Sequence, residues 1–180
     1  MEPAKIVLRA LAIFCGYGAL FGLVCAWLCP EVYTLAKPRD FGDLPAPALG
    51  VLWGMFDLLT YAAAIGVGTA FAAHVGHRPT VKAFFFTWPM AWLAGLVGAV
   101  ALVAGFLGRQ AALSGNHQLD RVMAFALPPE RHPIYIATWW ALLASQAVML
   151  LGGVFLAVWT WRKRAVFEQM VQAGEIRKTS

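Results

Sequence analysis

One carboxylate lies inside the apolar part of this chain, and it is the residue best suited to chemistry. Asp57 is the only charged residue in four long apolar runs. An ionisable side chain within a bilayer is costly, and such residues often mark proton relays, ion paths or substrate sites. Asp57 could therefore exchange a proton with a solvated cleft. It could equally serve as a buried hydrogen-bond partner between helices.

Other polar residues are expected at a comparable depth in the membrane. Thr60 and Tyr61 follow Asp57 by three and four residues, so all three share one helix face. Ser145 and Gln146 lie in the middle of the fourth apolar run. We therefore predict a polar intramembrane cluster that comprises Asp57, Thr60, Tyr61, Ser145 and Gln146. A structural hydrogen bond between helices and a transport site are both compatible with this cluster.

Histidine and cysteine, the usual metal ligands, are not arranged for metal binding. His74 and His77 fall in one loop, whereas His117 and His132 fall in another that is expected on the opposite side of the membrane. The three cysteines all lie in the first apolar run and form no CxxC motif. The sequence thus predicts no metal site and no catalytic residue, and it leaves the cofactor unknown.

The elements that would carry these residues are membrane helices. Apolar residues make up 61% of the chain and charged residues 13%, which is typical of an integral membrane protein. A helix needs about 20 apolar residues to cross the hydrocarbon core. Four runs meet this length, at residues 10–29, 48–73, 83–108 and 134–161. The predicted fold is all-α, a four-transmembrane-helix bundle in one domain of residues 1–161.

Lysine and arginine predict the orientation of the bundle. The amino terminus, the turn at residues 74–82 and the segment after residue 161 together hold nine of these residues, and the other two loops hold five. Cytoplasmic loops are enriched in positive charge. Both termini are therefore expected on the cytoplasmic side, or on the matrix side of a mitochondrial inner membrane. The first run has no small-residue cleavage site, so we expect it to remain as a membrane helix.

The connecting segments add two shorter predictions. Apolar residues recur at helical spacing between residues 109 and 133, which predicts a short interfacial helix with Ser114 or Asn116 as its cap. Residues 162–180 are expected to form a cytoplasmic helical tail. Pro89 should bend the third spanning helix near its first turns.

Small residues at four-residue spacing predict close contact between the helices. Association in lipid depends on packing, and glycine lets two backbones approach closely. The predicted packing positions are Gly18, Gly22, Gly66, Gly98, Gly105 and Gly153. They do not by themselves indicate whether the contact is within this chain or with another.

These patterns favour a non-catalytic small integral membrane protein that is a structural or assembly subunit of a larger membrane complex. The alternative is a small proton-coupled transporter or channel that uses Asp57. A weaker alternative is a membrane-embedded enzyme with an outer-side site. The expected partners are the lipid bilayer and other membrane subunits or a second copy, with no nucleic acid, because the net charge of +5 is explained by topology. The expected location is a bacterial or mitochondrial inner membrane.

Overall fold

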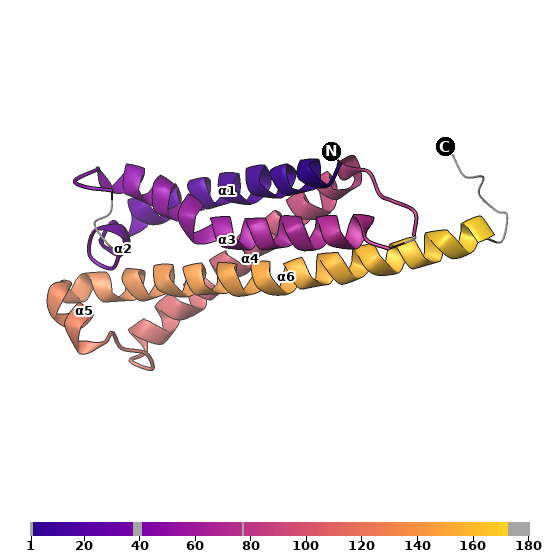
Figure 1. Ribbon diagram of the computed structural model, residues 1–180. Coiled ribbons are helices and arrows are strands. Elements are labelled where there is room, and N and C mark those ends of the chain that lie inside the picture. The colour runs from indigo at the N-terminus through magenta and orange to yellow at the C-terminus, as the bar shows by residue number, and fades with distance from the viewer. Residues whose placement is uncertain (1, 38–40, 77, 173–180) are drawn as a thin grey trace.

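The chain folds into an elongated bundle of helices (Figure 1). This computed structural model describes residues 2–37, 41–76 and 78–172. Within these ranges, four helices are long and apolar enough to cross a membrane. The long helices are α1 (Glu2–Leu28), α3 (Ala46–His74), α4 (Thr87–Leu113) and α6 (His132–Gln172), and the short elements are α2 (Glu31–Thr34), η1 (Ala83–Phe86), α5 (Arg121–Ala126) and η2 (Pro129–Arg131).

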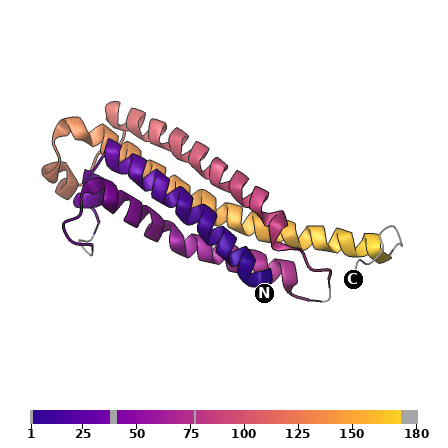
Figure 2. The same ribbon diagram turned by 90° about the horizontal axis from the view of Figure 1, so that it is seen from above.

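The bundle has two different ends. The end that carries α2 and α5 is here called the loop end, and the end where α1 begins is called the terminal end (Figure 1). Helix α6 has 41 residues, which at 1.5 Å per residue is about 60 Å. It therefore continues past the other helices at the terminal end, as its yellow portion in Figure 2 shows. Residues 162–172 are part of this helix, whereas the remainder of the expected tail lies outside the described residues.

Each half of the chain forms one tightly packed helix pair. Helix α1 packs along α3, helix α4 packs along α6, and α3 joins the two pairs through α6. In the first pair, Gly18 and Gly22 of α1 meet Gly50 and Gly54 of α3. A Cβ atom on Gly54 would collide with the Gly18 carbonyl oxygen, and one on Gly22 with the Gly50 carbonyl oxygen. These backbones are closer than any larger residue would allow.

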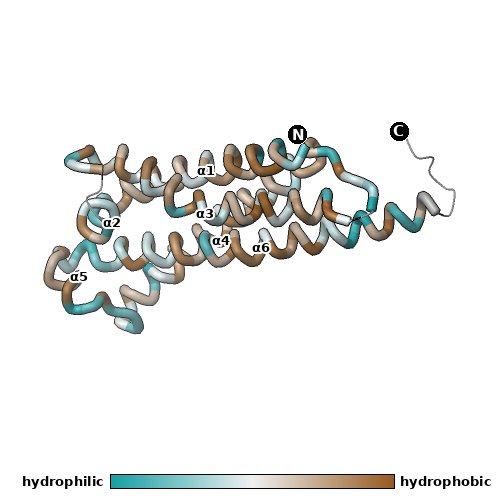
Figure 3. The backbone as a smooth tube through the Cα atoms, viewed as in Figure 1, coloured by the Kyte–Doolittle hydropathy of each residue, from teal (hydrophilic) through white to brown (hydrophobic). Residues whose placement is uncertain are grey.

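The other predicted packing glycines also lie against neighbouring helices. A Cβ on Gly66 would contact Val7 and Ala10 of α1, one on Gly98 would contact Tyr17, one on Gly105 would contact Ala137, and one on Gly153 would contact Ile65. These glycines thus lie at contacts between the helices of the bundle. Large apolar residues such as Leu102, Leu151 and Phe155 point outward and are 70–75% exposed. The brown stretches of the backbone in Figure 3 follow the four long helices.

Two local features differ from the sequence expectations. The short helix α5 is capped by Asp120, whose Oδ1 accepts hydrogen bonds from the backbone N–H of Val122 and Met123. Neither expected cap residue performs this function. Pro89 lies in the first turn of α4, directly after the 3₁₀ turn η1. Proline needs no intrahelical N–H partner in a first turn, so Pro89 removes no hydrogen bond from α4.

Candidate functional site

Asp57 of α3 is held in an ion pair by a residue from the first loop. The Lys37 ammonium donates to both carboxylate oxygens, at Nζ–Oδ distances of 2.6 and 2.7 Å. The two side chains are 18% and 14% exposed, so the pair is largely removed from solvent. Removal of one partner from such a pair leaves the other charge buried and uncompensated, which is strongly destabilising. Lys37 thereby ties the loop that follows α2 to the side of α3.

Aromatic residues surround this ion pair. The Lys37 Nζ lies 5.0 Å from the centroid of the Trp53 ring, one helical turn before Asp57. Phe41 packs its ring edge-on against Trp53, with centroids 5.2 Å apart. A cation over an aromatic face is attracted by the ring quadrupole. Lys37 thus has both a carboxylate and an aromatic partner.

Two buried polar atoms near the ion pair have no hydrogen-bond partner among the described residues. They are the hydroxyl of Tyr33 in α2 and Nε1 of Trp53. Burial raises the pKa of Tyr33 well above its usual range, and the neighbouring Cys25 and Asp57 raise it further. The Tyr33 hydroxyl therefore stays protonated and remains available as a donor beside the ion pair.

The remaining members of the expected polar cluster differ in their surroundings. Ser145 of α6 shares a hydrogen bond with Tyr17 of α1, at 3.3 Å between the hydroxyl oxygens, and also donates to the Ala141 carbonyl. Thr60 is exposed on the outer face of α3. Tyr61 packs beside the apolar core of the terminal half.

No hydrogen bond within the described ranges joins Asp57 to Thr60, Tyr61, Ser145 or Gln146. The sequence reasoning missed Lys37 and Tyr17, because helical spacing identifies neighbours on one helix but not across helices or loops. In the sequence, the one indication that Lys37 has a fixed position was the neighbouring Pro38 in a short loop.

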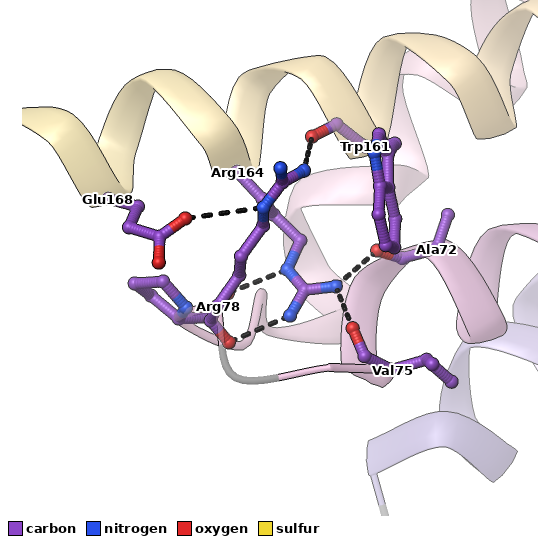
Figure 4. Close-up of polar contacts among 7 residues, drawn as sticks. Ala72, Val75, Arg78, Trp161, Arg164 and Glu168 are labelled. Carbon is purple, nitrogen blue, oxygen red and sulfur yellow. Dashed lines mark hydrogen bonds and ion pairs between the residues drawn. The ribbon is translucent and has the colours of Figure 1, made fainter.

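A second polar centre lies at the terminal end, and sequence reasoning missed it as well. Arg164 of α6 is 1% exposed, yet its guanidinium makes four hydrogen bonds to backbone carbonyls (Figure 4). Its acceptors are Ala72 at 2.6 Å, Val75 at 3.0 Å, Arg78 at 2.7 Å and Pro79 at 2.8 Å. The first two carbonyls belong to the end of α3, where helix carbonyls have no intrahelical partner.

Arg78 supports the same centre from the loop after α3. Its Nε lies 3.2 Å from Glu168 Oε2, and its guanidinium stacks over Trp161 at 4.6 Å from the ring centroid. Figure 4 shows both arginines between α6 and this loop. The two guanidinium groups thus fasten the α3–η1 loop to α6. The sequence offered only a basic cluster after residue 161, which topology alone would explain.

His74, His132 and Cys29 each have a local hydrogen-bond partner. His74 pairs with the Ala70 carbonyl and His132 with the Leu127 carbonyl, each at 3.1 Å. The Cys29 thiol donates to Glu31 at 3.3 Å, and Cys25 is buried. In the part of the chain that the structure describes, no three His, Cys, Asp or Glu residues are grouped as metal ligands.

The described residues line at least two hollows on the surface of the bundle. The larger, of about 620 Å³, is an apolar groove between α4 and α6. The smaller, of about 270 Å³, lies at the loop end between α5, the segment before it and the first turns of α6. Their linings differ, since the groove is almost purely apolar and the smaller hollow combines aromatic rings with polar groups. They therefore suit different occupants.

No protein-family model, curated protein or solved structure matches this chain. The residues and their contacts therefore carry the functional assignment.

Proposed function

We propose that this chain is a non-catalytic integral membrane protein that acts as a structural or assembly subunit of a larger membrane complex. The observation that supports this function best is the groove between α4 and α6. The groove is lined by Trp92 and Leu96 of α4 and by Phe155 and Trp159 of α6. No charged side chain lines it. It is a surface for packing and not for reaction chemistry.

The proposed occupant of the groove is a transmembrane helix of a partner subunit. Its residues on α6 run from Val148 to Trp159, which is about 17 Å or three turns along the helix axis. Helix association in lipid relies on close packing, and a groove of this length would give a partner helix about three turns of apolar contact. Leu96 and Leu151 line the groove and are 54% and 70% exposed, so they would contact such a helix.

The polar groups inside the bundle support a scaffold with fixed internal geometry. The Asp57 carboxylate is paired with Lys37, and the Arg164 guanidinium is hydrogen-bonded to four backbone carbonyls. Hydrogen-bonded and paired groups of this kind stabilise one arrangement of the helices. The basic terminal end favours an orientation with both termini on the cytoplasmic or matrix side. The membrane would be a bacterial or mitochondrial inner membrane, with α5 at the opposite interface.

Site-specific crosslinking in native membranes tests this function. A photoactivatable amino acid placed at Leu96 or Leu151 should crosslink to one defined membrane protein, which native electrophoresis and mass spectrometry then identify as a stoichiometric companion. The matched control is Leu102 of α4, which is 75% exposed and does not line the groove. Crosslinks to lipid alone, to a second copy of this chain, or equally from Leu102 would contradict the subunit assignment.

A proton-coupled transporter centred on Asp57 is the alternative, and the buried carboxylate is the observation that favours it. Transport would require the Lys37–Asp57 ion pair to open during each cycle. The test is proton flux into vesicles that contain the purified protein. Flux that is abolished by Asp57→Asn would replace the subunit assignment, whereas equal background flux in both proteins would exclude this alternative. A membrane-embedded enzyme remains the weaker alternative.

A further inference from the structure

The smaller hollow has the lining of a ligand site. It lies at the loop end, under α5 and the segment that joins α4 to it. Its floor is formed by Tyr135, Trp139 and Trp140 from the first three turns of α6. His117, Gln118 and Asp120 form its polar rim. Aromatic rings and one carboxylate thus line the same hollow of about 270 Å³.

The aromatic rings are held in place by their neighbours. The Tyr135 and Trp139 rings are nearly parallel, with an interplanar angle of 5° and centroids 6.4 Å apart. The His117 ring meets Trp140 edge-on at 5.5 Å between centroids. On its other side, Trp140 packs on Gly108 of α4, where a Cβ atom would collide with the indole. The floor is therefore ordered before any ligand arrives, which lowers the entropy cost of binding.

Asp120 supplies a negative charge at the rim without being neutralised by an ion pair in the described structure. Its Oδ1 accepts the two backbone N–H groups at the start of α5, at 2.9 and 3.0 Å. Those bonds hold the carboxylate in one position. The next residue in the chain, Arg121, is exposed and carries a positive charge.

We infer that this hollow binds an organic ammonium group, such as the choline or ethanolamine headgroup of a zwitterionic phospholipid. Aromatic faces attract ammonium groups through their negative π clouds, and the Asp120 carboxylate adds a complementary charge. The first turns of α6 place the site where headgroups lie, and Trp and Tyr are common at that depth. Arg121 is placed to contact the phosphate that accompanies the ammonium in such a lipid.

The size and polarity of the hollow argue against other ligand classes. Pockets for drug-sized molecules usually have about 300–1,000 Å³, and this one is smaller. The Asp120 carboxylate opposes an anionic headgroup. The polar rim would lose hydrogen bonds to water if an acyl chain filled the space. A compact organic cation satisfies both the aromatic floor and the polar rim.

Native mass spectrometry of the full chain in detergent tests the site. Phosphatidylethanolamine, phosphatidylcholine and phosphatidylglycerol are added at equal concentrations, and the retained lipid is counted. We expect the two zwitterionic lipids to be retained at least fivefold over phosphatidylglycerol. Asp120→Asn should reduce this retention about tenfold while it preserves the fold, because asparagine caps helices as well as aspartate does. Trp139→Leu should have a similar effect.

The matched control is Trp27→Leu, since Trp27 is 71% exposed near the loop end of α1 and does not line the hollow. Choline chloride separates the two sources of the ligand. Displacement of the lipid only by a large excess of choline assigns the site to a lipid headgroup, whereas strong choline binding without retained lipid assigns it to a free amine. Equal retention of phosphatidylglycerol, or retention unchanged by both Asp120→Asn and Trp139→Leu, would overturn the inference.

Discussion

Replacement of Arg164 by methionine should destabilise the bundle by about 4 kcal/mol. Each of the four carbonyls that Arg164 binds would lose a charge-assisted hydrogen bond, worth about 1.5–3 kcal/mol apiece. Their bare sum, roughly 6–12 kcal/mol, overstates the loss because water can reach some carbonyls at a helix end. The lost cation at the α3 C-terminus adds roughly 1 kcal/mol through the helix dipole.

Two further variants separate geometry from charge. Arg164→Lys keeps the positive charge but replaces the planar fork of donors by one nitrogen, so we expect about half of the loss, roughly 2 kcal/mol. Arg162→Met removes an exposed arginine from the same helix, and we expect a change below about 0.5 kcal/mol. The assay is equilibrium unfolding in bicelles with increasing SDS, followed by tryptophan fluorescence. If Arg164→Lys were as stable as the native protein, or Arg162→Met as damaging as Arg164→Met, the four-carbonyl argument would be wrong.

Three other predictions concern the ion pair, the helix contact and the orientation. Lys37→Met should lower the free energy of unfolding by about 3 kcal/mol, because Asp57 would be left buried and unpaired. Adding Asp57→Asn should restore more than half of that loss. If the losses of the two single variants were additive in a double-mutant cycle, the ion pair would be refuted. Gly54→Ala should lower the thermal midpoint of unfolding, because the added Cβ would collide with the α1 backbone. The control is Gly95→Ala, where the added Cβ would face open space and the midpoint should fall less. Equal shifts in the two variants would contradict the α1–α3 contact. In a cysteine-free background, Thr80→Cys should react with impermeant maleimide only after the cells are opened, and labelling of intact cells would reverse the proposed topology.

Local sequence properties were sufficient to predict the spanning helices. Burial of an apolar helix in lipid depends on the length and hydropathy of a contiguous segment, and both can be read without knowledge of the fold. The glycine pairs in α1 were also visible as a local pattern. Their partners Gly50 and Gly54 were not predicted, because the rotation of α3 about its axis depends on all its neighbours together.

The polar centres show the limit of local reasoning most clearly. Asp57 stood out as a charge in an apolar run, but its partner Lys37 comes from a loop twenty residues earlier in the chain. Arg164 was indistinguishable in sequence from the basic residues beside it, although it is buried and they are exposed.

The amino-acid sequence by itself determined that this protein has four apolar helices of spanning length, since partition into a membrane depends on each segment separately. The tertiary structure alone decided which polar groups meet, which face of α4 and α6 forms a groove, and where aromatic rings and Asp120 enclose a hollow. Those features depend on helix rotation and on the paths of loops. Both are set by the packing of segments that are distant in sequence.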